Sequence, residues 1–403
     1  MVSVNQKILF VHYSYVEMTG GERMTLQLLT GMRQSEFTPV FLTQRMGPLA
    51  EAAQANGIAT MIVPLPKMLD RYDGQILQYS IVQKCHTAVQ LLAYNRSVAK
   101  LLRKECISAV WCSNIRALLT VGFTVRALHI PLVWNIWLAR QFGKWTHAIY
   151  DLCYFLPTHI VTEYRSQAST VFRRLNVSRR QVKISTVYTG IDASFFNTRR
   201  QEASTPALTV NRACHLLSCC RITPRKDVGC LLEAMAILGR RGRNIRLTIA
   251  GSPFSDRDRS YYQELIEKVA RDGTGSLVQF TEWQQDIRPL LEAADIFVSS
   301  SSDEGLPGAV REAQAAGLPV VATDAGGTRE AVLDGLTGLI VPCHDAQALA
   351  DAIERVAEDP LLARRFGDAG RRRVSELFST EGFIQGYCAV FRRLLPPQED
   401  RAA

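Results

Sequence analysis

The sequence predicts an α/β protein made of two doubly wound domains, each a parallel sheet covered by helices. Its 403 residues exceed one ordinary core and suit two domains. Short apolar runs typical of buried strands alternate with helical patterns in both halves of the chain. Between the halves, residues 192–210 are polar and aperiodic, as in a connector. We therefore expect one domain over residues 1–195 and a second over residues 205–379.

The first domain should begin with a strand at residues 7–12, followed by a glycine loop at Gly20 and Gly21 and then a helix. Glycines in such a loop allow the backbone to approach a phosphate or an acceptor, so both are candidate substrate-binding residues. Further strands are expected at residues 37–43, 59–64, 109–112, 132–136 and 159–162.

The second domain repeats the alternation. Its strands are expected at residues 214–221, 245–250, 277–281, 295–299, 319–323 and 338–341. Asp303 begins a turn after the fourth of these strands, and Pro307 suits the first turn of the helix that follows, which should end at Gly317. Backbone amides from Gly305 onward should therefore point into the crevice beyond the strand ends, where ligands of doubly wound folds bind.

Two carboxylates flank the start of this helix. Glu304 and Glu312 are eight residues apart, close to two helical turns, so they should share one face. That spacing would let them hold two ends of one ligand. The alternative is that Glu304 belongs only to a turn and Glu312 only to a solvated helix face.

Composition excludes a disordered or fibrous protein and leaves several kinds of binding partner open. Hydrophobic residues make up 47% and charged residues 21% of the chain, which is typical of a globular protein. Residues 1–200 hold 23 Lys and Arg against 10 Asp and Glu, whereas the remainder is slightly acidic. A basic half suits an anionic substrate, an anionic membrane or nucleic acid, and solvated arginine is the plainer explanation.

The ten cysteines form no CxxC pair, which fits reduced thiols in the cytoplasm. No apolar stretch approaches the length that spans a bilayer, so any membrane contact is expected to be peripheral.

The segment EGLPGAVREAQAAGLPV, beginning at Glu304, resembles the donor site of family 4 retaining glycosyltransferases. VYTGID at residues 187–192 and GLTGLIVP at residues 335–342 resemble further signatures of that family, with Thr189 where Asn is usual. The resemblance implies a GT-B fold, with two Rossmann-like domains facing a cleft. It also implies that the C-terminal helix, residues 380–396, packs back on the first domain.

The same resemblance implies site residues. Glu304 would lie at the donor sugar and diphosphate and Glu312 at the ribose hydroxyls. The amides of Gly305, Leu306 and the residues that follow Pro307 would contact the sugar hydroxyls, so Pro307 and Gly308 are also candidate substrate-binding residues. Arg221 and Lys226, five residues apart after a strand, would hold the donor diphosphate. These cations and the helix amides would stabilise the leaving charge, so no metal and no cofactor is expected.

Three features depart from that pattern or stay open. The family often carries a His after a Pro-led strand, but IPLVWNIW at residues 130–137 has Asn135 and Trp137 there. His12 and His129 cannot replace it on position alone. Asp256-Arg257-Asp258 resembles a metal-binding D-x-D, but it opens a helix, where acidic residues are usual. Trp283 either packs as an ordinary aromatic residue or stacks on the nucleobase.

The sequence therefore predicts a retaining glycosyltransferase that moves a sugar from a nucleotide diphosphate donor to a hydroxyl acceptor. UDP is the commonest donor nucleotide in the family. The acceptor is expected to be anionic, lipid-linked or a polysaccharide precursor at the inner membrane face, and no nucleic acid is expected. Cations proposed to contact lipid are Lys100, Arg103, Lys104, Arg173, Arg174, Arg179 and Arg180. Alternatives are a GT-B epimerase or phosphorylase, and a non-catalytic protein that binds membrane or nucleic acid.

Overall fold

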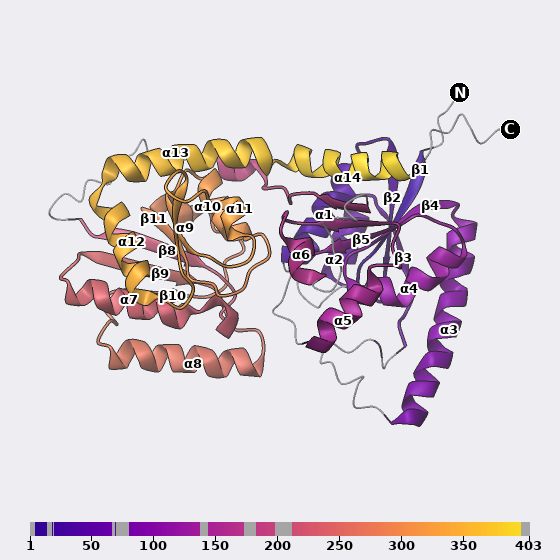
Figure 1. Cartoon of the computed structure of the whole chain (residues 1–403), viewed down its shortest axis with the longest axis horizontal. Helices are drawn as coiled ribbons and strands as arrows, with labels where there is room; N and C mark the ends of the chain where they lie inside the picture. The colour runs from indigo at the N-terminus through magenta and orange to yellow at the C-terminus, as the bar shows by residue number, and fades with distance from the viewer. Residues whose placement is uncertain are drawn as a thin grey trace. The chain divides into compact units, whose positions relative to one another are not determined.

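The protein is described here by a computed structural model. The structure describes residues 5–13, 18, 20–66, 69, 80–137, 144–172, 183–197 and 212–395. The chain divides into two compact units (Figure 1). Unit 1 comprises Met1–Tyr188 together with Glu381–Ala403, and unit 2 comprises Thr189–Thr380.

Unit 1 is built on a parallel sheet with the strand order β3-β2-β1-β4-β5-β6-β7. Its strands are β1 (Gln6–Val11), β2 (Phe37–Thr43), β3 (Ala59–Ile62), β4 (Ile107–Cys112), β5 (Leu132–Ile136), β6 (His159–Thr162) and β7 (Ile184–Thr186). The intervening helices are α1 (Gly20–Met32), α2 (Pro48–Ala55), α3 (Ile81–Lys104), α4 (Ile115–Ala127), α5 (Lys144–Cys153) and α6 (Gln167–Val171).

Local sequence explains where these elements begin. The last four residues of β1 are buried and apolar, as expected for a central parallel strand. Ser80 caps α3 through a capping box with Gln83, and the Asn114 side chain accepts a hydrogen bond from the Ala117 amide at the start of α4.

The C-terminal helix α14 (Thr380–Leu394) belongs to the core of unit 1. Phe383, Tyr387 and Phe391 are buried among side chains of β1, β4 and α1. The Tyr387 hydroxyl donates a 2.5 Å hydrogen bond to Asn135 Oδ1. One face of this sheet is therefore completed by a segment that comes from the other end of the chain.

Unit 2 contains a second parallel sheet with the order β10-β9-β8-β11-β12-β13. Its strands are β8 (Cys214–Cys219), β9 (Ile245–Ala250), β10 (Val278–Thr281), β11 (Ile296–Ser299), β12 (Val320–Thr323) and β13 (Gly338–Val341). Its helices are α7 (Val228–Arg240), α8 (Asp256–Arg271), α9 (Arg288–Ala293), α10 (Gly308–Ala315), α11 (Thr328–Ala331), α12 (Ala346–Glu358) and α13 (Pro360–Leu377), with 3-10 turns η4 (Ala193–Asn197) and η5 (Pro224–Lys226).

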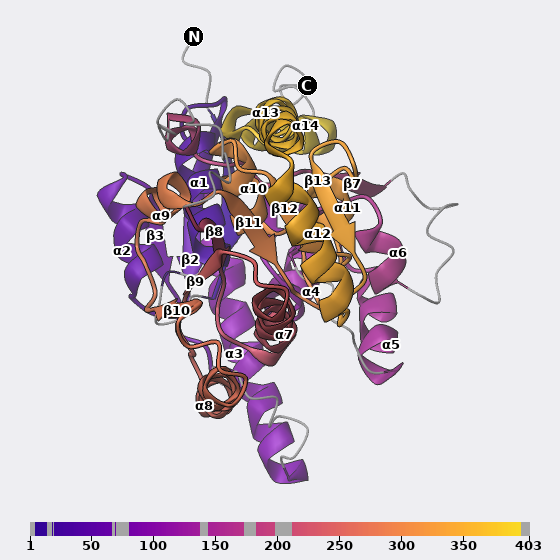
Figure 2. The same ribbon diagram turned by 90° about the vertical axis from the view of Figure 1, so that its left-hand side faces the viewer.

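Figure 2 shows α8, α7 and α12 in a row, and side chains of all three share one apolar core with the second sheet. Both sheets are parallel and doubly wound, which confirms the predicted fold class. In each sheet the strand order reverses once, between β1 and β4 in unit 1 and between β8 and β11 in unit 2. Such reversals are the places where open α/β sheets bind ligands at the carboxyl ends of their strands.

The division between the units lies a few residues before the polar connector. Thr189 and Ile191 lie with unit 2, because the Arg311 guanidinium donates to the Thr189 hydroxyl at 2.8 Å and the Ile191 amide donates to Phe378 O at 2.8 Å. Residues 198–211 of the connector lie outside the described residues.

Candidate functional site

A pocket opens at the carboxyl ends of β8 and β11, where the strand order of unit 2 reverses. Its lining comes from the end of β8, the 3-10 turn η5, strand β11 with the loop after it, and the first turn of α10. The lining residues are Ser218, Cys219, Cys220, Lys226, Phe297, Val298, Ser299, Ser300, Ser301, Glu304, Pro307, Gly308, Ala309 and Val310. The loop that the sequence analysis singled out therefore lies in the crevice expected for a ligand.

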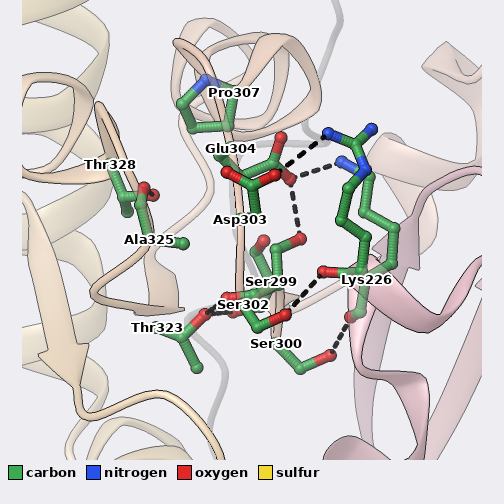
Figure 3. A network of polar contacts seen from close by, with 12 residues as sticks. Lys226, Ser299, Ser300, Ser302, Asp303, Glu304, Pro307, Thr323, Ala325 and Thr328 are labelled. Atoms are coloured by element: carbon green, nitrogen blue, oxygen red, sulfur yellow. Dashed lines mark hydrogen bonds and ion pairs between the residues drawn. The ribbon is translucent and has the colours of Figure 1, made fainter. Parts of the chain in front are cut away.

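The central contact of this pocket is an ion pair between Lys226 and Glu304 (Figure 3). Lys226 Nζ donates to Glu304 Oε1, and the Ser301 hydroxyl donates to the same oxygen at 2.7 Å. Both charged side chains are largely buried, with 15% and 10% of their surfaces exposed. Two residues that lie 78 positions apart in the chain are thus brought together by neighbouring strands.

Further bonds tie the turn η5 to the loop after β11. The Ser300 hydroxyl donates to Lys226 O at 3.0 Å, and the Ser302 amide donates to Arg225 O at 2.9 Å. Arg225 also lies 3.8 Å from the Asp303 carboxylate. Ser300 and Ser302 bond to η5 and Ser301 bonds to Glu304, so the serine run holds the loop in position rather than lengthening the strand.

The electrostatics of Glu304 combine two opposing effects. Burial by itself raises the pKa of the carboxyl, because the charged form loses its hydration. The Lys226 ammonium and the Ser301 hydroxyl outweigh burial and hold the pKa below its usual value. Glu304 is therefore a carboxylate at neutral pH, and Lys226 is the partner that keeps it charged.

A glycine turn packs behind Glu304. Gly326 has a φ of 53°, and a Cβ built there would lie 1.8 Å from Glu304 O. The next amide, Gly327 N, donates to Gly305 O at 2.9 Å. Only glycine allows this approach, so the loop after β12 fixes the backbone on which Glu304 is carried.

The helix after this loop begins later than its sequence suggests. Pro307 is the N-cap of α10, Leu306 and Gly305 are buried in the loop, and Gly308 is the first helical residue. Glu304 therefore lies outside the helix, and the expected two-turn spacing to Glu312 is wrong.

Glu312 lies little more than one turn into α10. Burial raises the pKa of the Cys219 thiol at the end of β8, and the charge of Glu312 raises it further. Glu312 is not among the residues that line the pocket.

Arg221 and Lys226 take different positions. Whereas Lys226 lines the pocket, the Arg221 guanidinium lies over the Phe254 ring, 4.3 Å from its centre. Trp283 packs edge-on against Phe254 with ring centres 6.2 Å apart, and 47% of its surface is exposed. These residues follow β8, β9 and β10 and form an aromatic shelf beside the pocket.

Unit 1 carries the other predicted positions. Gly20 and Gly21 form the first turn of α1 rather than a separate loop. Among the described residues, apart from its chain neighbours and the backbone of α1, none comes within 4 Å of a Cβ built at Gly20. His12 is buried at the end of β1, with Nε2 3.2 Å from Glu22 Oε1 and Nδ1 3.3 Å from the Thr25 hydroxyl.

Asn135 and Trp137, which stand where the family often has a histidine, both contact other side chains of unit 1. Asn135 is bonded to Tyr387, as described above, and Trp137 packs against His12 and Trp111 with ring centres 5.6 and 5.7 Å apart. His129 is exposed after α4, with a φ of 57°.

The D-x-D sequence has a structural role. Asp256 and Asp258 lie in the first turn of α8, and Asp258 completes a capping box with Ser255. Across the part of the chain that the structure describes, no group of three or more His, Cys, Asp or Glu is arranged to hold a metal. Arg173, Arg174, Arg179 and Arg180 lie outside the described residues. No helix among the described residues is long and apolar enough to cross a membrane.

Sequence reasoning missed the residues that support the predicted ones. Ser301, Arg225 and Phe254 carry no motif of their own, although the run of four serines at residues 299–302 was visible. Phe254 lies on the strand-end loop next to that of Arg221, a neighbour relation that depends on the strand order.

Comparison with known proteins agrees with this placement. Residues 209–373 match the family model described as glycosyl transferases group 1. The chain is 33% identical over 210 residues to the lipopolysaccharide core biosynthesis glycosyltransferase LpsE of Rhizobium meliloti, which covers 52% of this chain and 57% of that protein. It is 32% identical over 219 residues to a D-inositol 3-phosphate glycosyltransferase of Saccharomonospora viridis, with 53% and 50% covered. The matches thus span about half the length of these relatives.

Solved structures match almost the whole chain at low identity. The Anabaena protein HepE in complex with UDP aligns with a TM-score of 0.79 and 18% identity, covering 96% of this chain and 100% of that one. Sucrose-phosphate synthase from Thermosynechococcus elongatus aligns with a TM-score of 0.75 and 19% identity, covering 96% and 99%. The chain therefore has the GT-B fold, and the part that carries the pocket lies within residues 209–373, which match the model of group 1 glycosyl transferases.

Proposed function

We propose that the protein is a retaining glycosyltransferase that transfers a sugar from a UDP-sugar to a hydroxyl group. The observation that carries the proposal is the buried pair of Lys226 and Glu304 at the switch point of a sheet that matches group 1 glycosyl transferases. HepE, which has the same fold, has been solved with UDP, UDP-glucose and UDP with glucose. These complexes support the choice of UDP as the nucleotide.

In this proposal the donor diphosphate lies between Lys226 and the start of α10. Transfer leaves negative charge on the diphosphate, and a fixed cation together with helix N-terminal amides stabilises that charge most in the transition state. Arg221 would add a second positive charge from its position on Phe254. Positive charge from the protein thus takes the place of a metal ion, and no cofactor enters the reaction.

The remaining donor contacts follow from their place around the pocket. Glu304 would hold the sugar, Glu312 the ribose, and the backbone of Gly305, Leu306, Pro307 and Gly308 the sugar hydroxyls. Trp283, which is half exposed on the aromatic shelf, would stack on the nucleobase. Gly20 and Gly21, at the start of α1, would approach the acceptor.

Retention of the anomeric configuration follows from attack on the same face from which the diphosphate leaves. In that route the acceptor oxygen bonds to the anomeric carbon, the carbon–oxygen bond to the diphosphate breaks, and the leaving diphosphate accepts the acceptor proton. No protein nucleophile is then needed, so the Glu304 carboxylate can remain paired with Lys226.

We assign the acceptor to the anionic or lipid-linked precursors of surface polysaccharides, at the cytoplasmic face of a membrane. The basic first half of the chain supports this class, with 23 Lys and Arg against 10 Asp and Glu. Two relatives, LpsE and the amylovoran biosynthesis glycosyltransferase AmsK of Erwinia amylovora, are named for lipopolysaccharide core and amylovoran biosynthesis.

The test has two stages. A thermal-shift panel of nucleotide sugars should identify the donor, because a ligand that binds the folded state raises the unfolding temperature. With that donor, single changes of Glu304, Lys226, Arg221 and Glu312 to Ala should each lower transfer, by about 100-fold for Glu304 and Lys226. Glu292→Ala, an exposed carboxylate on α9, is the matched control and should stay near wild type.

Three results would contradict the proposal. Near-wild-type transfer in all four variants would remove the assigned site. Labelled donor that returns as an epimer, or that is released only by phosphate, would indicate an epimerase or a phosphorylase. Salt-sensitive binding to lipid or nucleic acid without any turnover of nucleotide sugar would indicate a non-catalytic protein.

A further inference from the structure

The longest helix of unit 1, α3, presents two different stripes along its length. Its inner stripe is buried and consists of Thr87, Tyr94, Val98 and Leu102. The opposite stripe is exposed and changes from apolar to basic along the helix. It begins with Val82, Val89 and Leu92 and continues with Arg96, Lys100 and Arg103. Val82, Val89 and Leu92 are 78%, 65% and 61% exposed, so three large apolar side chains share the solvent-facing stripe of one helix.

The neighbouring helices α4 and α5 also present large apolar side chains to solvent. Phe123 of α4 is 68% exposed, Leu152 of α5 is 75% exposed, and Phe155 just after α5 is 57% exposed. α4 packs against the segment just after α5, because a Cβ built at Gly122 would lie 2.8 Å from Leu156. Helices α3 and α4 touch as well, through the Thr124 hydroxyl and the Asn95 side chain.

These helices lie on the face of the sheet opposite α1, α2 and α14. The side chains of α1, α2 and α14 form one core on their own face, and right-handed crossovers place α3, α4 and α5 on the other (Figure 1). We call the exposed surface of α3, α4 and α5, with Phe155, the α3–α5 face.

The exposed charged side chains described on these helices are all positive. Their sequences contain eight Lys and Arg and a single acidic residue, Asp151, which is buried. The exposed cations include Arg96, Lys100, Arg103 and Arg126. An exposed apolar face bordered by cations and free of exposed carboxylates is the composition of a surface that lies on anionic lipid.

We propose that the α3–α5 face docks on the surface of an anionic lipid bilayer, with its apolar side chains among the acyl chains and its cations at the lipid phosphates. Exposed Val, Leu and Phe side chains favour lipid over nucleic acid, whose backbone is contacted mainly by polar and charged groups. Two copies of the face would bring like charges together, which disfavours self-association. The inference rests on the part of the proposed function that assigns a membrane-located acceptor, and it adds the surface that contacts the membrane.

Vesicle flotation with the full chain tests the proposal without any donor or acceptor. At low salt, vesicles of phosphatidylcholine with phosphatidylglycerol should retain the protein about tenfold more strongly than phosphatidylcholine alone, and added salt should weaken retention. Equal retention by both kinds of vesicle, or retention by neither, would overturn the proposal.

Two pairs of variants locate the contact. Leu92→Ser with Leu152→Ser, and Arg96→Glu with Arg103→Glu, should each weaken retention by anionic vesicles about tenfold. The matched controls lie in unit 2. Leu361→Ser with Leu377→Ser, and Arg257→Glu with Arg372→Glu, alter exposed side chains of the same kind and should leave retention unchanged. Equal losses in test and control variants would place the contact elsewhere and overturn the proposal.

Other occupants of the face would show different results. If the wild type binds duplex DNA but is not retained by vesicles, and Arg96→Glu with Arg103→Glu abolishes DNA binding, the face binds nucleic acid and the proposal is overturned. If the wild type is a dimer in sedimentation velocity and is not retained by vesicles, and Leu92→Ser with Leu152→Ser dissociates the dimer, the face binds a second copy of the chain. That result would also overturn the proposal. Unchanged thermal unfolding checks that each variant is folded, since the altered side chains are exposed.

Membrane docking can be tested separately from the proposed enzyme activity. Glu304→Gln should float with anionic vesicles as well as wild type does, even where it has lost transfer, because Glu304 belongs to unit 2. Flotation of the wild type together with a lack of transfer by every donor would leave the docking surface in place and reject the transferase.

Discussion

At the scale of single residues, Glu304 depends on its partners for its charge. Burial raises the pKa of a carboxyl because the charged form loses its hydration. For Glu304, the Lys226 ammonium and the Ser301 hydroxyl lower the pKa by more than burial raises it. Pairing of this kind is costly to break from one side, because the remaining charge stays buried without its partner. The pair therefore contributes to stability as well as to the proposed donor site.

This coupling predicts a pH dependence of stability. The pKa of Glu304 is lower in the folded chain than its ordinary 4.5, so the pair stabilises the fold above that pH and the stabilisation is lost as pH falls through the lowered value. At neutral pH, Glu304→Gln should reduce the free energy of unfolding by about 3 kcal/mol. Urea unfolding across a pH series should show this difference shrinking only at acidic pH.

A control variant distinguishes the effect of the Lys226–Glu304 pair on stability from the effect of acid on the rest of the protein. Glu292→Gln alters an exposed carboxylate in the same unit and should follow the wild type throughout. A Glu304→Gln difference that is already lost near neutral pH would mean that the pKa is raised rather than lowered.

At the scale of elements, the site is made where three strand-end loops meet. The loop after β11 carries Glu304, the turn after β8 carries Lys226, and the loop after β12 presses Gly326 against Glu304 O. Short parallel strands with polar ends thus fix the position of a loop that has no regular structure of its own.

The role of the third loop can be measured with a matched pair of glycines. Gly326 and Gly335 have similar positive φ angles of 53° and 72°, but only Gly326 faces a backbone atom that a Cβ would overlap. Gly335→Ala should lower the free energy of unfolding by about 1 kcal/mol for backbone strain alone. Gly326→Ala should cost roughly 3 kcal/mol or more and should also weaken donor binding. Equal costs in urea unfolding would show that the contact with Glu304 O is unimportant.

At the scale of the whole molecule, the two units differ in how the chain builds them. Unit 2 is one continuous segment, whereas unit 1 needs α14 from the end of the chain. Phe383, Tyr387 and Phe391 fill the face of the unit 1 sheet that α1 and α2 leave incomplete. Removing them would expose a large apolar area, which few domains tolerate.

Fragments test this difference. Residues 189–380 should unfold cooperatively on their own, whereas residues 1–188 should lack a cooperative transition in thermal circular dichroism. Joining residues 381–395 to residue 188 through a short Gly-Ser linker should restore the transition, since Val187 lies against α14 at Gly386. Cooperative unfolding of residues 1–188 alone would show that α14 is dispensable.

The sequence alone determined the fold class, the positions of most strands and the identity of the loop at Asp303 to Glu312. These are local properties, because apolar runs, glycines and prolines act through neighbours in the chain. The one expectation about this loop that is wrong is the two-turn helical spacing of Glu304 and Glu312, because the structure begins α10 at Gly308 and leaves Glu304 in the loop.

Only the tertiary structure decided which residues meet. Ser301 and Lys226 converge on Glu304, and Arg221 turns to Phe254, because β8 lies beside β11 and β9 in the sheet. The packing of α14 likewise depends on contacts over more than 300 residues, as between Met32 and Cys388. A sequence shows its periodicity but not the strand order, and the strand order sets which loops share a crevice.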